Sequence, residues 1–84
     1  MHFTLRQLQV FDAVARHLSF SRAARELHLT QPAVSMQVKQ LEGRAGLPLF
    51  EQAGKRLFLT VAGRALCHQT HSIQGQIEET SQTL

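Results

Sequence analysis

Three side chains that stand close together in the sequence, Cys67, His68 and His71, are of the types that bind zinc or form a nucleophile and its base. In a helix they fall within about one turn, so they could face a common ion. A structural zinc site needs a fourth ligand at a suitable spacing, however, and none is evident. No acidic residue stands nearby in the sequence to orient a histidine. We therefore predict neither a metal site nor a cofactor.

Catalytic patterns are missing from the rest of the chain as well. The sequence has no paired carboxylates, no glycine-rich phosphate loop and no catalytic triad pattern. We predict that the chain is not an enzyme.

Binding chemistry is indicated by the segment from residue 30 to residue 43. At about 100° per residue, one face of a helix in this segment carries short or polar groups, a single cation and no carboxylate. Its members are Pro32, Ser35, Met36, Lys39 and Gly43. Such a face suits a groove of DNA, although any amphipathic helix has a polar side that can simply be solvated.

The helix that presents this face is predicted over residues 31–45. Thr30 can cap it, and Pro32 in the first turn costs little because the first amides have no acceptor within the helix. Apolar residues at helical spacing form the opposite stripe, which we expect to be core: Val34, Val38, Leu41 and Ala45.

A short helix is predicted just before it, over residues 21–29, with Ser21 as its N-cap. Thr30 follows so closely that only a tight turn can connect the two. Short helix, tight turn and longer helix make up the helix-turn-helix pattern, in which the second helix enters the major groove of DNA.

A first helix is predicted to precede this pair. It begins at a capping box formed by Thr4 and Gln7, and Phe3 can pack onto Leu8 as a staple. We expect it to be core, with His17 capping its C-terminus.

A two-stranded wing is predicted after the central helix. Gly46 and Pro48 mark a stop, and residues 49–51 and 56–59 read as short strands around a turn. Lys55 and Arg56 at the tip could reach backbone phosphate or the neighbouring minor groove. A solvated hairpin tip is the alternative interpretation.

The last helix is predicted to run from a cap at Thr60 to the end of the chain. Alternating spacings of four and three residues produce a heptad seam along it, formed by Leu66, Thr70, Ile73, Ile77, Thr80 and Leu84. A helix of about 24 residues, roughly 36 Å long, outreaches so small a core. We therefore expect a second helix on the seam, with packing on the chain's own domain as the alternative.

Length and charge are compatible with these expectations. The 84 residues can form one domain with a modest core. Residues 1–64 hold all nine Lys and Arg against four acidic residues, a net charge of +5, whereas residues 65–84 hold two acidic residues and no Lys or Arg. This imbalance supports an anionic partner, although ordinary soluble domains reach similar values.

Localisation can be predicted from three further features. The single cysteine excludes an internal disulfide framework, and no apolar run approaches the roughly 20 residues that span a bilayer. Met1 is followed directly by helix-like sequence without a signal peptide. We expect a cytoplasmic protein without membrane contact.

Five motifs in order resemble the N-terminal DNA-binding domain of LysR-type bacterial transcription regulators, over about residues 5–66. They are LSFSRAA (18–24), LHLTQPAVS (27–35), QLE (40–42), LFE (49–51) and LTVAG (59–63). Residues 30–42 are most similar to the regulators of Calvin-cycle carbon-fixation operons within that family. The resemblance implies double-stranded promoter DNA as the partner.

Site residues are implied by the same resemblance, position by position. Those expected at base edges, with Lys39 reaching bases or phosphate, are Thr30, Gln31, Pro32, Ser35, Met36 and Lys39. Those expected to hold the DNA backbone are Ser21, Arg22, Lys55 and Arg56.

Three positions depart from the family pattern. Gln52 and Met36 stand where many members have arginine or another basic residue, and Val61 stands where proline is usual. The first weakens a phosphate clamp at the wing. Met36 could touch a thymine methyl group instead of a phosphate.

The last helix of LysR-type proteins pairs antiparallel with its twin, so the resemblance implies a homodimer that could pair into a tetramer in a full-length protein. The interface residues would be Leu66, Thr70, Ile73, Ile77 and Leu84. In such proteins the helix leads to an effector-binding domain, which is absent from this sequence, and a small-molecule effector would act only through that domain.

The sequence as a whole predicts a mainly α winged helix-turn-helix with a two-stranded wing and a long C-terminal linker helix. Residues 1–60 would form the DNA-binding domain and residues 61–84 the linker and dimerisation helix. The alternative function is a helical protein-protein interaction module that works through the seam of residues 66–84. It leaves the polar face and the basic wing unexplained.

Overall fold

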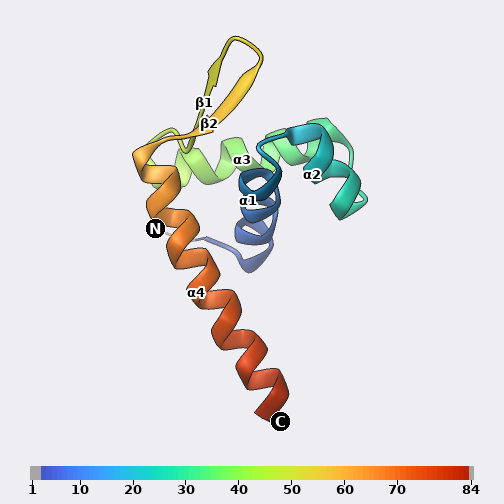
Figure 1. Ribbon diagram of the computed structural model, residues 1–84, viewed down its shortest axis with the longest axis vertical. Helices are drawn as coiled ribbons and strands as arrows, with labels where there is room; N and C mark the ends of the chain where they lie inside the picture. Colours follow the sequence, from blue (N-terminus) through green and yellow to red (C-terminus); the bar gives the residue numbers. More distant parts are fainter. Residues whose placement is uncertain (1–2, 84) are drawn as a thin grey trace.

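The computed structural model describes residues 3–83, which form four helices and one two-stranded hairpin (Figure 1). In chain order these are α1 (Leu5–His17), α2 (Phe20–Leu27), α3 (Gln31–Ala45), β1 (Phe50–Ala53), β2 (Arg56–Leu59) and α4 (Val61–Thr83). The predicted mainly helical winged helix-turn-helix with a long last helix is confirmed. Leu84, which was assigned to the seam, lies outside the described residues.

Helix α1 is the centre of the molecule. The predicted capping box is present, because the Thr4 hydroxyl accepts a hydrogen bond from Gln7 N and the Gln7 side chain accepts one from Thr4 N, both at 3.0 Å. Six of the eight residues from 8 to 15 are apolar, and all eight except Gln9 are buried. Because buried residues lie on most sides of α1, the other elements pack on it from several directions.

Two buried clusters meet on α1. One joins α1 to α2 and α3 and consists of Val10, Ala13, Val14, Ala23, Ala24, Val34 and Val38. The other joins α1 to α3 and to the segment before the wing and consists of Phe11, Ala15, Leu41 and Leu49. The apolar stripe predicted for α3 is therefore core, with Ala45 half-buried at its end.

The turn between α1 and α2 corrects two sequence predictions. Helix α2 begins at Phe20 with Ser19 as its N-cap, because the extended backbone of Ser19 lets its hydroxyl accept a hydrogen bond from Arg22 N at 3.1 Å. Ser21 lies two residues further on, inside the helix, and is not the cap. The C-cap of α1 is Leu18, in the left-handed conformation with φ 47°, and not His17.

Helix α3 begins and ends as predicted. Thr30 is its N-cap and accepts a hydrogen bond from Ala33 N at 3.2 Å. Gly46 ends it with φ 72°, where a side chain would be strained, and its N–H donates to Glu42 O at 2.8 Å.

The wing is held at its base by aromatic contacts and by one carboxylate. Strands β1 and β2 pair antiparallel, with Phe50 opposite Leu59 and Ala53 opposite Arg56. The Phe50 ring lies 5.4 Å from that of Phe11 and 6.0 Å from that of Phe20, between centroids. The Glu42 carboxylate accepts a hydrogen bond from Leu49 N at 2.7 Å. The wing is therefore attached to both α1 and α3.

Helix α4 begins in the core and then leaves it. Thr60 caps it as predicted, accepting from Gly63 N at 3.0 Å while its hydroxyl donates to Pro48 O at 2.7 Å. Leu66 and Cys67 pack against the second cluster, whereas the red end of α4 in Figure 1 extends away from the other elements. The division of the chain at residue 60 stays a prediction. Among residues 3–83, no helix is both long and apolar enough to cross a membrane.

The contact between α4 and the segment before the wing depends on Gly63. A Cβ atom at Gly63 would overlap the carbonyl oxygen of Leu49 and come within 2.9 Å of Leu59 Cδ2. Because backbone cannot yield as a flexible side chain can, Gly63→Ala should lower the free energy of unfolding by about 1–3 kcal/mol.

Gly75 provides the matched control on the same helix, since nothing lies within 4 Å of the Cβ it would gain. Gly75→Ala should raise the free energy of unfolding by about 0.5–1 kcal/mol, the difference in helix preference between the two residues. Urea unfolding of both variants measures this; equal changes in the two would contradict the close approach at Gly63.

Candidate nucleic-acid interface

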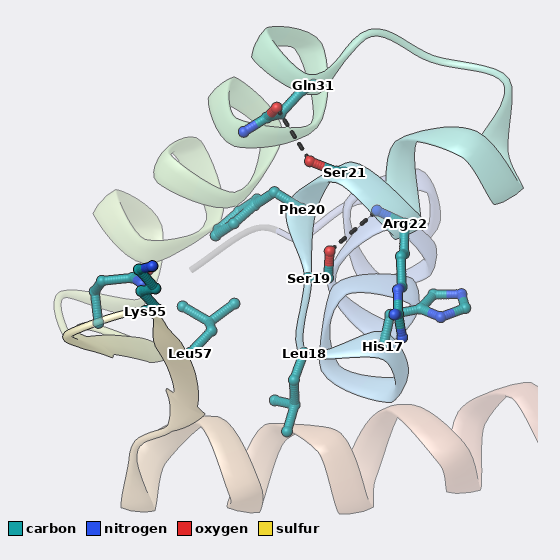
Figure 2. A pocket seen from close by; sticks show the side chains of 10 residues that line it. His17, Leu18, Ser19, Phe20, Ser21, Arg22, Gln31, Lys55 and Leu57 are labelled. Carbon is teal, nitrogen blue, oxygen red and sulfur yellow. Dashed lines mark hydrogen bonds between the residues drawn. The ribbon is translucent and has the colours of Figure 1, made fainter.

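Four of the residues predicted to contact DNA line one groove, of about 370 Å³, between the start of α2, the start of α3 and the wing (Figure 2). They are Ser21, Arg22, Gln31 and Lys55. The Ser21 hydroxyl donates a hydrogen bond to Gln31 Oε1 at 3.3 Å, which joins the two helices at the mouth of the groove. Lys55 enters from the wing side. Elements far apart in sequence thus place two cations and two hydrogen-bonding groups around one hollow.

A second groove, of about 260 Å³, continues from the first between α3 and the wing. Ser35 and Lys39 of α3 line it, and three residues are shared by both grooves: Phe20, Gln52 and Leu57. Glu42 also lines this groove, but its carboxylate is occupied by Leu49 N and Phe50 N. The two grooves form a continuous hollow along the polar face of α3.

Gln52 is a member of this hollow that was not assigned to the site. Its side chain donates to Gly54 O at 3.1 Å within the wing. Alternation along a strand puts Gln52 on the same face as Phe50, which packs on the core, so this face must point toward α3. The same alternation in the sequence could have identified Gln52.

The same alternation determines the face of the wing on which Arg56 lies. Because Arg56 pairs with Ala53 in the ladder, it lies on the face of the hairpin opposite to Gln52 and Leu57. There it lines a different hollow, which is completed by Leu18, Lys55, Leu57 and Phe58. Lys55, in the turn, lines both this hollow and the first groove, whereas Arg56 lines only this hollow of the two.

The remaining predicted residues on α3 lie outside both grooves. Thr30, Pro32 and Met36 are exposed, and Met36 keeps 53% of its surface accessible. The Thr30 hydroxyl already accepts the capping hydrogen bond from Ala33 N, although it can still donate one. An uncovered methionine on a polar helix face is free to meet an apolar partner.

A chain of ion pairs behind the groove fixes α2 against α1. The Arg16 guanidinium donates to Glu26 at 2.9 Å through one nitrogen and to Asp12 Oδ2 at 2.9 Å through Nε. His17, which was predicted to cap α1, instead lies with Nε2 2.9 Å from Glu26 Oε1. Hydrogen bonds from Arg16 and then His17 lower the pKa of Glu26 from 4.5 to about 2.

The predicted seam on α4 divides into two parts. Leu66 packs on the core, and Thr70 is fully buried, with its hydroxyl donating to Leu66 O at 2.8 Å. Thr70 therefore has no surface left for a second copy, and the prediction that it lies in a dimer interface is corrected. Ile73 and Ile77 remain 40% and 45% exposed. The seam is buried up to residue 70 and exposed beyond it, because α4 extends past the core at that point.

The fold brings an acidic residue to the pair formed by Cys67 and His71. No acidic residue is near it in the sequence, yet Asp12 Oδ1 lies 2.7 Å from His71 Nε2. Burial first, and then the charge of Asp12, raise the pKa of the Cys67 thiol. Cys67 is thus a neutral thiol at neutral pH and a poor nucleophile. His68 is exposed on another side of α4.

Known proteins with the same pattern are bacterial regulators. Residues 5–64 match the family model described as "Bacterial regulatory helix-turn-helix protein, lysR family". The RuBisCO operon transcriptional regulator of Allochromatium vinosum is 57% identical over 84 residues, all of this chain and 28% of that protein. The HTH-type transcriptional regulator CbbR of Rhodospirillum rubrum is 59% identical over 80 residues, 95% of this chain and 27% of that protein. The chain thus spans little more than a quarter of the length of these curated relatives.

A solved protein-DNA complex has the same fold. The crystal structure of the BenM_DBD/catB site 1 DNA complex matches with a TM-score of 0.91 and 27% identity, over 96% of this chain and 91% of that one.

The ion pairs of Glu26 make stability depend on pH. Because the pKa of Glu26 is lower in the folded chain, its contribution is present above pH 4.5 and is lost as the pH falls toward about 2. Glu26→Gln should lower the urea midpoint at neutral pH and flatten its dependence on pH within that window. Since the Glu26 side chain is 37% exposed, molar salt should shrink the difference between the two proteins.

Glu51→Gln is the control for this experiment, because Glu51 is exposed on the wing, away from the ion pairs. It should leave the profile of urea midpoint against pH unchanged. If Glu26→Gln and the unmodified chain lost stability in parallel below pH 4.5, the ion pairs would not hold α2 on α1.

Proposed function

This chain belongs to the lysR family of bacterial regulatory helix-turn-helix proteins, whose DNA-binding domain it is, and on that premise we propose which residues read promoter DNA. Helix α3 would lie in the major groove, with the wing on the backbone or in the neighbouring minor groove. The observation that carries the proposal is the convergence of Ser21, Arg22, Gln31 and Lys55 on one groove. Membership of a family of transcription regulators also confirms the prediction that the chain is not an enzyme.

Base reading is assigned to the exposed start and polar face of α3. Gln31 has an amide that can both donate to and accept from an adenine edge, and the Ser21 hydroxyl limits the orientations of that amide. Its neighbours on the same surface complete the set: Thr30, Pro32, Ser35, Met36 and Lys39. Met36 suits a thymine methyl group, and Lys39 can reach a base or a phosphate.

Backbone contacts are assigned to groups that flank the base-reading residues. Arg22 and Lys55 stand on opposite sides of the groove that contains Gln31, so they can hold phosphates on either side of a base contact. Arg56 points from the other face of the wing and would meet phosphate or the minor groove at a separate place. Gln52 adds a neutral donor where many relatives of LysR type carry arginine.

A homodimer is proposed from the free end of α4. Ile73 and Ile77 are exposed, and Ile77 lies beside Leu5 of α1 in a shallow hollow of about 290 Å³ that Gln9, Gln74 and Glu78 complete. Apolar groups at heptad spacing favour a second helix over water. A twin α4 would cover them and set two copies of α3 at a fixed distance, which is how dimeric helix-turn-helix proteins read paired half-sites. A partner helix from another protein is the alternative occupant.

Control of a RuBisCO operon is proposed for the whole protein. The support is identity of 57% and 59% with two regulators, one of which is named for that operon, over nearly the whole chain. A protein that reads chromosomal promoters works in the bacterial cytoplasm, so that localisation belongs to the same proposal.

Replacing Gln31 tests base reading. Gln31→Ala should weaken binding to DNA from upstream of the RuBisCO operon by about 1–3 kcal/mol and should make one base position of that site interchangeable. Binding to unrelated DNA should hardly change, because phosphate contacts supply nonspecific affinity. Fluorescence anisotropy with single-base variants of the site measures both effects.

Lys55→Ala is the matched variant from the opposite side of the same groove. It should weaken binding to every sequence and reduce the slope of log affinity against log salt by about one. Equal losses on all sequences for Gln31→Ala would refute its role at a base. An unchanged slope for Lys55→Ala would mean that the wing does not touch phosphate.

Replacing Ile73 and Ile77 together by aspartate tests the homodimer. Unpaired carboxylates in a buried seam cost several kcal/mol, so the double variant should be monomeric by light scattering while α1 to α3 stay folded. Its affinity for paired half-sites should fall to that for one half-site. Ser72→Asp and Gln82→Asp, which add the same charge at exposed positions of the same helix outside the seam, should remain dimeric. Unmodified chain that is monomeric at high concentration would exclude the twin helix.

A further inference from the structure

Side chains of three metal-binding types converge where α4 crosses α1. One oxygen of Asp12, the Cys67 sulfur and one His71 nitrogen all lie within 4.8 Å of one another. His71 Nε2 is 2.7 Å from Asp12 Oδ1 and 3.8 Å from Cys67 Sγ. Carboxylate oxygen, thiolate sulfur and imidazole nitrogen are the ligands that zinc uses in proteins.

The orientation of the imidazole distinguishes a metal site from a catalytic relay. In a relay of cysteine, histidine and acid, the thiol and the carboxylate bind different nitrogens of the ring. Here both face Nε2 of His71. One nitrogen cannot take a proton from Cys67 while donating a proton to Asp12, but a metal ion on Nε2 would face both other ligands.

We propose that Asp12, Cys67 and His71 bind one Zn²⁺ or a similar divalent transition-metal ion, with water as the fourth ligand. Bonds of about 2.0–2.3 Å at tetrahedral angles place ligand atoms roughly 3.3–3.7 Å apart. The separation of 3.8 Å between Cys67 Sγ and His71 Nε2 is already close to that value. The Asp12 to His71 separation must widen by about half an ångström, which the 54% exposed His71 side chain can provide by rotation.

The surroundings of the three ligands suit a divalent ion. Arg16 Nε holds the other Asp12 oxygen at 2.9 Å and so orients the carboxylate, as partners behind a metal ligand commonly do. Arg16 also pairs with Glu26, which offsets its positive charge. Cys67 would release its proton on binding. Thiolate and carboxylate together would then balance a charge of +2.

Bound metal would join α1 to α4 at the last buried turn of α4. Cys67 packs on the core and His71 stands next to fully buried Thr70, directly before the exposed stretch with Ile73 and Ile77. The ion would therefore fix the direction in which the free end of α4 leaves the domain. This role is separate from DNA reading, since neither groove beside α3 contains a ligand of the site.

Cobalt binding gives a direct test that involves no DNA. The reduced 84-residue chain is treated with a chelator, freed of it and titrated with Co²⁺, which occupies zinc sites and absorbs in the near ultraviolet when a thiolate binds it. We expect this band to saturate at one ion per chain and to disappear when Zn²⁺ is added. The melting temperature should rise with Zn²⁺ concentration, because the ion binds the folded state.

Three variants locate the ion. Cys67→Ser and His71→Gln should each weaken Zn²⁺ binding by at least the 10–100-fold that loss of an outer-shell partner costs, and Cys67→Ser should remove the band. His68→Gln, next to Cys67 but outside the cluster, should bind like the unmodified chain. Circular dichroism without metal checks that each variant is folded.

The opposite results would overturn the proposal. No thiolate band in the unmodified chain would mean that no metal binds Cys67. Unchanged Zn²⁺ affinity in folded Cys67→Ser and His71→Gln would mean that the ion binds elsewhere on the surface. Loss of binding in His68→Gln alone would place the ion at that histidine.

Discussion

The burial of α1 is the constraint on which the rest of the molecule depends. A chain of this length has little interior, and it gains a core by surrounding one helix with all its other elements. The residues from Val10 to Ala15 are buried in sequence, so faces that would be wet in a surface helix are covered here. Asp12 is the one carboxylate in that run. Because a buried charge must find partners, Asp12 draws Arg16 from its own helix and His71 from α4.

The groove beside α3 follows from how α2 is held on this central helix. Leu18, in the turn before α2, and His28, in the turn after it, adopt the left-handed conformation, with φ 47° and 56°. Side chains there are strained by about 1–2 kcal/mol, which the buried contacts on either side must offset. Both turns are short, because two residues separate α1 from α2 and three separate α2 from α3. They bring Ser21 within hydrogen-bonding distance of Gln31 and leave Arg22 at the edge of the hollow that the wing closes with Lys55.

Helix α4 lies in two environments: its first part packs on the core and its last part is exposed. The change between them is abrupt. Its first turn is pressed against the backbone before the wing so closely that only glycine fits at position 63. Thr70, two turns further, still has no exposed surface, but Ile73 is already 40% exposed. The proposed metal ligands stand at that transition, and the proposed dimer contacts lie beyond it. An ion bound there would act on the geometry of a dimer without touching DNA.

The elements and their order could be predicted from the residues alone, because they depend on local preferences. The capping box at Thr4, the cap at Thr30, the stop at Gly46 and the strands around Gly54 all have neighbours within a few residues as their cause. The motifs of the family are local too, so the resemblance to LysR-type regulators could be recognised in the same way. The N-cap of α2 was predicted at Ser21 and is Ser19, because a serine at either position can cap a helix and the backbone conformation decides between them.

Which side chains meet could not be predicted in this way, because it depends on how the helices pack. Periodicity places Leu66, Thr70, Ile73 and Ile77 on one stripe of a helix, but it cannot say where the core ends, and that point separates Thr70 from Ile73. Lys55 lies in the turn of the hairpin, and only the packing of the wing beside α2 brings it to the groove that contains Gln31. Asp12 and His71 are 59 positions apart, and they meet only because α4 crosses α1. Contacts of this kind depend on the packing of whole helices, which no local pattern encodes.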